Sequence, residues 1–471
     1  MSDYLESYLQ PLAQDNFLQR AFEEALVPST KFLAAAPYEK MPPGSDGRMI
    51  QTVAANMDID LDPVVPGEDA KSQSNKYEWY KCDVKQWDGS QPVPMNQAQL
   101  TLAGVEGFWI QKFRELAVNC GTKLNLLCRN ELYKGYLQGN TMTYAPTANA
   151  LSVFLVSGNG FRTRVVNKVE QPISPTNTRT VFIDGQQRTA TGWAPLDAAL
   201  PDGPGVLTVT VNVTVAINRP VLDKNRSRII RPNGAQHIDG ISANDIATMA
   251  MFRRAAAELD NDFVPPMVDG TYHVHLAPNV CDQLRSDNEF QRMFETRRGE
   301  YMEDGSLGVI GNLRFFSNNQ TPQPGDRNSP NPLDVAAATA GARTTLLSPN
   351  YYGELYNIDG VQIQRSIVIG RNAIRCMYED EAAMMLAEAS APIGATVSFA
   401  KVGSTLQMMA GSDKMGQVRI TVRPPIDKRG QNTDITWSTT RGWAIPSNLL
   451  SGQSDAQNKR AIAIETGFAP I

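Results

Sequence analysis

Histidine is scarce in this chain, with three copies among 471 residues, and the short motifs of common enzymes are missing. No GxxxxGK(S/T) phosphate loop, no GxSxG nucleophile elbow and no HExxH zinc helix occurs. Gly158 and Gly160, in SGNGFRT, lack the third glycine of a dinucleotide fingerprint. The sequence therefore predicts no catalytic residue and no cofactor, and only an enzyme that uses scattered carboxylates would escape these criteria.

Two of the three histidines lie two residues apart. His273 and His275 fall on one face of an expected strand, where two imidazoles could bind one metal ion. A third ligand would have to come from elsewhere, for example from Cys281. Because packed or surface histidines are commoner than metal ligands, this spacing alone predicts no metal site.

The five cysteines are an odd number without CxxC spacing, which predicts neither a disulfide framework nor a zinc knuckle and suits a reducing compartment. The first residues, MSDYLESYLQPLAQDNF, are acidic and polar where a secretory signal needs basic residues and an apolar core. No run of about 18 apolar residues occurs, so a soluble protein without a membrane segment is expected.

Basic charge is not in excess either. The chain has 44 Lys and Arg against 49 Asp and Glu, and a net charge of -5 does not favour binding to a nucleic-acid backbone. Any DNA nearby is expected to be enclosed and not read. The 42% hydrophobic and 20% charged residues are ordinary values for a globular protein. The length allows about three lobes of roughly 150 residues each.

A short amphipathic helix is expected near the start of the sequence. Residues 15–27 place apolar residues at helical spacing, and Pro28 ends the stretch. A helix of this length is marginal alone in water, so its apolar face must dock on something. Two possibilities stay open, docking on its own domain or gripping a neighbouring molecule as an arm. The candidate anchors are Phe17, Leu18, Phe22 and Leu26.

An extended excursion is expected next. Residues 37–94 contain scattered Pro and Gly, and the run KYEWYKCDV, at 76–84, has the residue types of a strand. These features predict a long loop of two strands. Its candidate buried contacts are Tyr77, Trp79 and Trp87.

Two parts of different character follow. Helix-forming residues predict a long helix from about 99 to 137, in one piece or in two that meet at Gly121. Residues 143–235 are rich in Thr, Val, Pro and Gly, and VLTVTVNVTVAI alternates as a strand does, so a β-rich insert is expected. Five arginines near the ends of the insert are expected to be solvated surface charge: Arg162, Arg164, Arg226, Arg228 and Arg231.

The remainder mixes helices and strands. The tetrapeptide SAND, at 242–245, resembles a capping box in front of a core-packed helix. The run GTYHVHLAPNVCDQLRSDNEFQRMF predicts a strand and then a helix that begins at Pro278. SLGVIGNLRFF, at 306–316, predicts a strand, and an Ala- and Met-rich helix is expected near 379–391. The expected apolar face of the helix after SAND is Ile246, Met249, Phe252, Ala256 and Leu259.

The order of these parts, together with four motifs, resembles a known family. An arm, an extended loop, a long helix, a mixed lobe and final strands follow one another as in the major capsid proteins of tailed bacteriophages, which have the Hong Kong 97-type fold. The motifs YHVHLAPNVCDQLRSDNEFQRMF, LGVIGNLRFF, IVIGRNAI and AIAIETG are similar to those of the branch typified by coat proteins of N4-type podoviruses. The resemblance covers most of the chain in order.

The resemblance implies an α+β fold with a defined order of segments. These are an N-terminal arm at 1–46, an E-loop at 47–96, a peripheral domain with the spine helix at 97–160, a β-rich insertion domain at 161–235, an axial domain at 236–400, and C-terminal strands of the peripheral domain at 401–471.

The resemblance also implies a function and partners. A major capsid protein assembles as hexamers and pentamers into the icosahedral shell of the virion, in the host cytoplasm, and encloses double-stranded DNA without sequence-specific binding. The implied partners are further copies of the chain, a scaffolding protein, a portal and a decoration protein. Some members join a loop lysine to an asparagine of a neighbour. No feature selects one of the loop lysines here, so no crosslink is predicted at Lys71, Lys76, Lys81 or Lys85.

Three other classes stay open at this point. An encapsulin-like compartment would share the fold but normally lacks so large an insert. A hydrolase would need scattered carboxylates or a metal at His273 and His275. A β-rich tail or adhesion protein would form a trimer or a tube. The shell subunit is favoured because the order of segments fits it and catalytic motifs are lacking.

Overall fold

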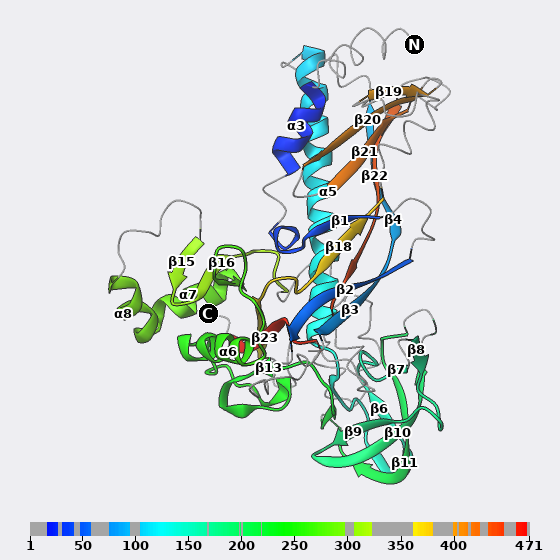
Figure 1. Cartoon of the computed structure of the whole chain (residues 1–471), viewed down its shortest axis with the longest axis vertical. Helices are drawn as coiled ribbons and strands as arrows, with labels where there is room; N and C mark the ends of the chain where they lie inside the picture. Colours follow the sequence, from blue (N-terminus) through cyan, green and yellow to red (C-terminus); the bar gives the residue numbers. More distant parts are fainter. Residues whose placement is uncertain are drawn as a thin grey trace, which may run out of the picture. The chain divides into compact units, whose positions relative to one another are not determined.

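Two compact units make up the chain, and each combines segments that are far apart in the sequence (Figure 1). Unit 1 contains Met1–Gln51, Lys81–Arg129 and Ile374–Ala444, and unit 2 contains Thr52–Tyr80, Asn130–Ala373 and Ile445–Ile471. The computed structural model describes residues 17–26, 31–41, 48–57, 75–94, 104–166, 169–196, 198, 201–217, 219–296, 306–322, 361–379, 399–402, 405–412, 416–423, 432–446 and 458–468. The predicted α+β class is confirmed, because both helices and several sheets are present.

The longest described element is the helix α5, Gly104–Tyr136, of 33 residues. It continues through Gly121, so the long helix is a single piece. An interior glycine costs a helix about 1 kcal/mol relative to alanine, which the burial of apolar residues on both sides of it offsets. Trp109, Phe113 and Leu124 are fully buried. The helix belongs to unit 1 as far as Arg129 and to unit 2 beyond it.

Unit 1 is organised around one long strand, β22, Asn432–Ala444. Along one edge it pairs antiparallel with β4, Lys85–Pro94, and along the other with β21, Gly416–Val422, and then β18, Arg375–Tyr378. Three further strands complete this seven-stranded sheet: β1, Tyr38–Lys40, β19, Phe399–Val402, and β20, Thr405–Ser412. A thirteen-residue strand with partners along both edges satisfies its backbone hydrogen bonds and serves as the centre of the unit.

Two short helical segments at the start of the described chain also belong to unit 1. The helix α3, Phe17–Leu26, packs against β20. A single 3-10 turn, η3, Leu33–Ala35, is held by Asn125 of α5, whose Oδ1 accepts hydrogen bonds from the backbone N–H groups of Phe32 at 2.7 Å and Leu33 at 3.0 Å. A buried amide thus supplies the partner that the first N–H groups of a helical turn otherwise lack.

The expected extended excursion is a pair of strands. β2, Arg48–Met57, and β3, Asn75–Asp83, form a two-stranded sheet of their own, and neither joins another described strand. The strand predicted from KYEWYKCDV is therefore confirmed. A lone two-stranded hairpin is marginally stable in water, so β2 and β3 depend on contacts beyond their own pairing.

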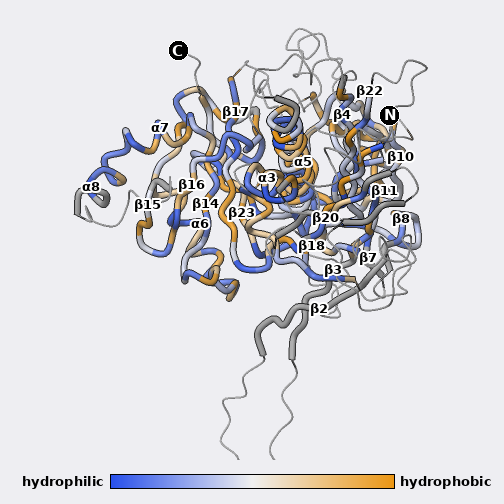
Figure 2. Tube along the Cα trace, turned by 90° about the horizontal axis from the view of Figure 1, so that it is seen from above, coloured by the Kyte–Doolittle hydropathy of each residue, from blue (hydrophilic) through white to orange (hydrophobic). Residues whose placement is uncertain are grey.

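A six-stranded sheet forms the core of unit 2, in the order β13-β23-β17-β14-β16-β15. Its central strands are buried almost throughout, and Figure 2 shows hydrophobic residues along β23. Strands buried on both faces need continuous apolar runs, as in AIAI and IVI. The strands are β13, Ile229–Ile230, β14, Tyr272–Leu276, β15, Ser306–Ile310, β16, Leu313–Ser317, β17, Gln362–Ile369, and β23, Ala461–Phe468.

Three helices accompany this sheet: α6, Met249–Asn261, α7, Pro278–Ser286, and α8, Asn288–Thr296. The expected helix start at Pro278 is confirmed, since proline fits the first helical position, where its missing N–H is not needed. Phe252 of α6 and Phe290 of α8 both meet Phe315 of β16 edge-on, with ring centroids 5.7 and 5.9 Å apart. These aromatic contacts join the helices to the sheet.

A second six-stranded sheet in unit 2 forms the β-rich part, in the order β5-β12-β9-β10-β11-β6, beside a separate hairpin of β7 and β8. β11, Gly205–Val215, alternates buried and exposed residues over most of its length, as the sequence predicts. This sheet also includes two strands that precede residue 161. The other strands are β5, Asn140–Met142, β6, Thr147–Leu155, β7, Thr163–Val166, β8, Val169–Pro172, β9, Arg179–Ile183, β10, Gln186–Pro195, and β12, Pro220–Asp223.

The two glycines of SGNGFRT have packing roles in this sheet. A Cβ on Gly158 would lie 2.3 Å from the indole of Trp193. Gly160 has a φ of +82° and lies against the backbone of Gly139, where a Cβ would come within 2.5 Å of the Gly139 nitrogen. Close approach of ring and backbone, and not a phosphate, therefore accounts for both residues.

Two local expectations from the sequence are wrong. The SAND tetrapeptide does not cap a helix, because Asp245 accepts hydrogen bonds from Ser242, and α6 begins only at Met249 after Thr248. Ile246 is accordingly 41% exposed, whereas the other predicted face residues of α6 are buried. SLGVIGNLRFF forms two antiparallel strands and not one, because the chain turns at Gly311, which has a φ of +64°. The helix expected near 379–391 lies outside the described residues.

The end of α6 carries an unusual residue for its backbone conformation. Val264 N–H donates to Leu259 O at 3.0 Å and Phe263 N–H to Asp260 O at 2.9 Å, the hydrogen-bond pair of a Schellman motif. The left-handed position of this motif is occupied by Phe263, with a φ of +55°, where glycine is preferred. The Phe263 side chain is also 72% exposed, so no packing inside the chain offsets the strain.

Replacing Phe263 by Gly should raise the free energy of unfolding of the unassembled chain by about 0.5–1 kcal/mol, because the left-handed strain is removed. Urea denaturation of the two proteins measures the difference. Phe263→Ala is the matched control, since it removes the ring but keeps the Cβ that causes the strain. Equal stability of the Gly and Ala variants would show that the backbone is not strained there.

Candidate functional site

The four predicted anchors of the first helix lie on α3. Leu18, Phe22 and Leu26 are at most 1% exposed within the single chain, where α3 packs against β20. The side chain of Phe17 lies outside the described residues. The face of α3 that remains exposed carries Arg20 and Glu24. Among the described side chains of this helix, a contact with a neighbouring molecule therefore falls to polar residues, while Leu18, Phe22 and Leu26 support their own unit.

The three predicted aromatic contacts of the excursion are divided between two strands. Tyr77 and Trp79 belong to β3, and their side chains lie outside the described residues. Trp87 belongs to β4 and is partly buried. Its indole N–H donates to Arg441 O at 3.1 Å, and its ring lies 6.2 Å from that of Trp443. Trp87 thus fastens β4 to β22.

The two closely spaced histidines do lie on the same strand, β14, but they contact an aromatic ring. The ring centroid of Phe316 is 5.0 Å from His273 and 5.6 Å from His275. His273 Nε2 lies 2.9 Å from Asp269 Oδ2. Burial raises the pKa of Asp269, but hydrogen bonds from His273 and Thr271 outweigh this effect and lower it to about 2. Among the described residues, no group of three or more His, Cys, Asp and Glu is placed to hold a metal ion.

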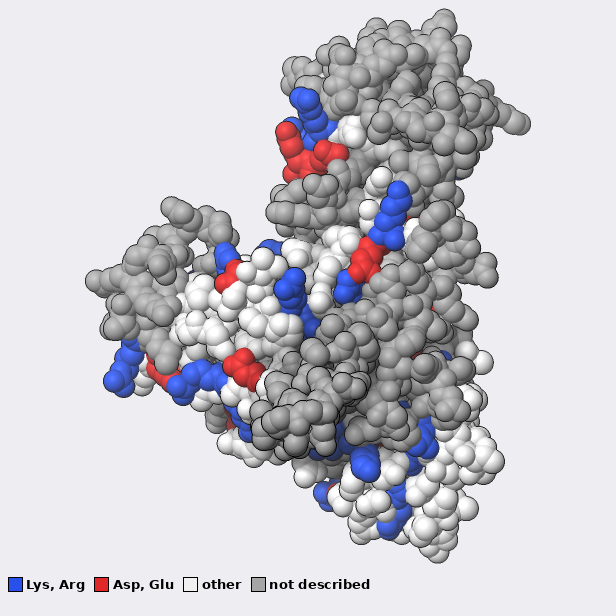
Figure 3. All heavy atoms as spheres, in the orientation of Figure 1, with Lys and Arg blue, Asp and Glu red and all other residues white. Residues whose placement is uncertain are grey.

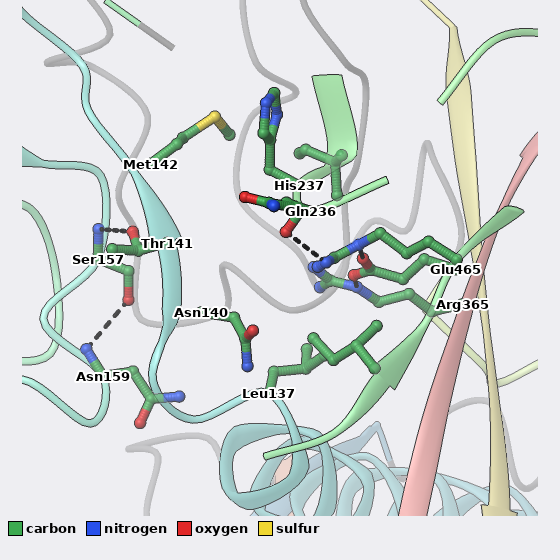
Figure 4. A pocket seen from close by; sticks show the side chains of 13 residues that line it. Leu137, Asn140, Thr141, Met142, Ser157, Asn159, Gln236, His237, Arg365 and Glu465 are labelled. Atoms are coloured by element: carbon green, nitrogen blue, oxygen red, sulfur yellow. Dashed lines mark hydrogen bonds and ion pairs between the residues drawn. The ribbon is translucent and has the colours of Figure 1, made fainter. Parts of the chain in front are cut away.

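The main polar feature of unit 2 is a buried carboxylate between two guanidinium groups, which the sequence did not single out (Figure 4). Glu465 of β23 accepts a hydrogen bond from Arg231 Nε at 2.7 Å and another from Arg365 Nε of β17 at 2.8 Å. The three side chains are 1%, 7% and 4% exposed, in that order. Burial by itself raises the pKa of Glu465, but the two positive charges outweigh it and hold the pKa below its usual value.

A small cavity adjoins this Arg231–Glu465–Arg365 cluster. It has a volume of about 30 Å³ and is also lined by Asn140, Ser157 and His237. A space of that size suits a water molecule and not an organic substrate. Ser157 is engaged in local structure, since its hydroxyl donates to Asp202 O at 3.1 Å and accepts from the N–H of Asn159 at 3.2 Å. The cluster is therefore a structural device and not a catalytic one.

The expectation that the five arginines near the ends of the β-rich insert are solvated surface charge is wrong for Arg231, whose side chain is 7% exposed and pairs with Glu465. The five do not form a single patch. Arg162 pairs with Asp202 at 3.4 Å, and Arg164 donates to Thr178 O at 2.7 Å. A different cavity, about 490 Å³ in volume, is lined by the remaining three, Arg226, Arg228 and Arg231. The structure adds Lys224 to its lining, and also Arg254 of α6, which the sequence did not connect with the arginines because it lies more than twenty residues after Arg231.

All five cysteines are buried as free thiols. Burial raises the pKa of Cys120 and of Cys376 to about 12, with a smaller opposing effect from Arg441. At neutral pH both groups are protonated and therefore poor nucleophiles. Among the described helices, none is long and apolar enough to cross a membrane.

Comparisons with known proteins find similarity at the level of solved structures. No protein-family model and no curated protein matches the sequence. The capsid of Ralstonia phage GP4 is similar with a TM-score of 0.47 and 13% identity, over 93% of this chain and 89% of that one. The head structure of Helicobacter pylori bacteriophage KHP40 is similar with a TM-score of 0.46 and 10% identity, over 94% of this chain and 91% of that one. The capsid of the cyanophage P-SCSP1u is similar with a TM-score of 0.43 and 10% identity, over 93% of this chain and 89% of that one.

The Arg231–Glu465–Arg365 cluster predicts a specific pH dependence. Because the pKa of Glu465 is lowered on folding, its contribution to stability is complete above the unfolded value of about 4.3 and is lost as the pH falls through the folded value. At pH 7, Glu465→Gln should cost about 3–5 kcal/mol, because it leaves two buried guanidinium groups without an anion. The stability gap between the two proteins should shrink below about pH 4.

Urea denaturation between pH 3 and pH 7 measures this gap. Glu289→Gln is the control, since Glu289 pairs with Arg253 at 2.8 Å in a more exposed position and should cost at most about 1 kcal/mol. A Glu465→Gln variant as stable as the wild type at pH 7 would show that the charge of Glu465 is not needed for folding.

Proposed function

We propose that this chain is a major capsid protein of a tailed bacteriophage, a subunit that assembles with further copies into a closed shell and performs no catalysis. One observation supports it above all. The four motifs that carry the resemblance to that family lie far apart in the sequence, yet they correspond to β14 with α7 and α8, to β15 and β16, to β17, and to β23. These five strands are consecutive neighbours in one sheet.

That arrangement matters because a single short motif can occur by chance, whereas four unrelated motifs would not be expected to lie on neighbouring strands of one sheet. β17 pairs with β23 over Gln362–Ile369, and β14 pairs with β17 on one side and with β16 on the other. A common sheet is what a set of motifs inherited with one fold predicts. We assign this sheet and its helices to the axial domain, expected at 236–400, and extend that domain to β13 and β23; β23 falls in the range 401–471 expected in the peripheral domain.

The remaining parts fit a shell subunit because they depend on neighbours. The β2–β3 hairpin has no further strand partner among the described residues and corresponds to the expected E-loop, 47–96. α5 corresponds to the spine helix, and the sheet of β5, β6 and β9–β12 to the insertion domain. Extended elements of this kind gain stability from contacts between subunits, which supply buried area that the chain alone lacks.

Several finer features belong to the same proposal. The copies form hexamers and pentamers, and a scaffolding protein, a portal and a decoration protein accompany them. The shell encloses double-stranded DNA without reading its sequence, in agreement with a net charge of -5. The particles assemble in the host cytoplasm, and the subunit belongs to the N4-type branch. The small cavity beside Glu465 and the engaged hydroxyl of Ser157 favour a structural role over a hydrolase.

Negative-stain electron microscopy tests the proposal. The full chain, expressed alone and together with its neighbouring genes, should yield closed, roughly icosahedral particles or sheets of hexamers. The particles should contain no covalent ladder on denaturing gels, since no lysine of the loop is selected for a crosslink. A small, monodisperse oligomer under both conditions would contradict the shell function, and a co-purifying cargo enzyme inside the particles would indicate an encapsulin-like compartment.

A further inference from the structure

The cavity of about 490 Å³ in unit 2 has a strongly basic lining. It lies between the segment that follows β12 and the helix α6. Its charged side chains are those of Lys224, Arg226, Arg228, Arg231, Arg254 and Glu258, and we call it the basic pocket. Its volume is in the range of sites that bind small ligands or a few side chains of a peptide.

Two of these cations are available for a partner. Arg228 pairs with Asp262 and lies 3.8 Å from Glu258, and Arg254 Nε lies 3.1 Å from Glu258. Lys224 and Arg226 are exposed, and neither forms an ion pair with a described residue. The pocket therefore offers one ammonium and one guanidinium group whose charges no described residue balances.

The segment that carries these two residues is held firmly in place. Asp223 is 1% exposed and accepts hydrogen bonds from Arg179 Nε at 2.6 Å and Nη2 at 3.0 Å. Asp223 Oδ2 also accepts from the N–H of Asn225 at 2.8 Å, and the Ser227 hydroxyl donates to Gly135 O at 2.8 Å. Such a fixed backbone presents Lys224 and Arg226 with little entropic cost on binding.

The basic pocket belongs to a part of the chain whose charge differs from the rest. Residues 140–235 contain ten Lys and Arg against five Asp and Glu, a net charge of +5, while the whole chain carries -5. Figure 3 shows Lys and Arg, with few Asp or Glu, over the β-rich end of the molecule in that view. The remainder of the chain must accordingly carry an excess of acidic residues.

The most one-sided acidic segment lies between the two strands of the lone hairpin. Residues 58–70 contain no Lys, Arg or His, and their acidic residues are Asp58, Asp60, Asp62, Glu68 and Asp69. β2 ends at Met57, before this segment, and β3 begins at Asn75, after it. At about 3.3 Å per residue, a strand of ten residues such as β2 spans roughly 33 Å, so the segment begins that far along the chain from Arg48.

We propose that the acidic segment 58–70 of one copy binds in the basic pocket of a neighbouring copy. The inference rests on the proposed function, in which many copies lie side by side. It adds that the acidic segment and the basic pocket are two surfaces that contact each other between copies. Arginine and lysine groups bind carboxylates through charge-assisted hydrogen bonds, and opposite potentials also fix the register of an interface. A phosphate backbone would use a long open stripe of cations, whereas here they converge on one pocket that includes Glu258.

A charge-exchange experiment tests the proposal with the full chain. The pocket variant K224E/R226E and the loop variant D58K/D60K/D62K each place like charges opposite one another, so each alone should assemble at least about tenfold less well than the wild type. A chain that carries both sets of changes should restore assembly to within about twofold, because every loop then meets a pocket of opposite charge. Mixing the two single-site variants should restore part of it, because contacts between unlike copies are matched. Particle yield is measured by sedimentation and electron microscopy.

Two controls separate charge at this site from other effects. R371E/R423E reverses two exposed cations outside the loop and the pocket and should assemble like the wild type. Thermal unfolding of the unassembled pocket variant should match the wild type, since Lys224 and Arg226 are exposed. A wild type that forms no particles at all would refute the shell function itself, whereas the following outcomes concern only the pocket.

Three outcomes would overturn the proposal while leaving the shell function intact. The first is normal assembly of the pocket variant. The second is a mixture that assembles no better than either variant alone although the chain with both sets of changes is rescued, which would place the loop in the pocket of its own chain. The third is a 20-base-pair DNA duplex that binds the wild type and not the pocket variant, with no rescue in the mixture, which would assign the pocket to nucleic acid.

Discussion

The charge of Glu465 inside a sheet is the constraint on which unit 2 depends. A buried carboxylate costs several kcal/mol unless cations reach it, and here they come from Arg365 on the neighbouring strand β17 and from Arg231, directly after β13. The three side chains therefore fix the register of strands that are distant in the sequence, since Arg365 and Glu465 are 100 residues apart and Arg231 and Glu465 are 234 apart. A shift of one residue would point Glu465 to the other face and leave two guanidinium groups unpaired.

The Arg179–Asp223 pair repeats the same device in the β-rich sheet. Both partners are at most 6% exposed, and they join β9 to the end of β12. In each sheet, then, a buried ion pair fixes the end of a strand, β13 in one sheet and β12 in the other. Apolar packing supplies most of the stability in both sheets, and the ion pairs select one arrangement among several that the packing would tolerate.

The sequence predicted regular elements well where their periodicity was strong. The long helix and the strands of KYEWYKCDV and VLTVTVNVTVAI are present, because apolar spacing over many residues leaves a single solution. It failed where a turn decided the outcome. Asp245 binds Ser242 in place of a helix cap, and Gly311 splits one predicted strand into two. Local turn chemistry competes with the capping pattern, and a pattern alone cannot rank the two.

The candidate sites were harder to predict than the fold. Glu465 follows AIAI in a buried strand, and an acidic residue in such an apolar run indicates that a cation lies nearby. Which residues supply that cation, here Arg231 and Arg365, depends on the order of the strands in the sheet. The basic pocket required Arg254 of α6 to meet the segment after β12. Contacts of this kind become visible only when distant segments are placed together.

The burial of every cysteine has a practical side. Thiols that solvent does not reach neither exchange disulfides nor react with alkylating reagents at an appreciable rate, so the five native cysteines would stay unchanged in an oxidising medium. A single cysteine introduced on an exposed strand of the β-rich sheet would then be the one readily labelled thiol in each subunit. The chain is thus already suited to the attachment of a probe at one chosen position.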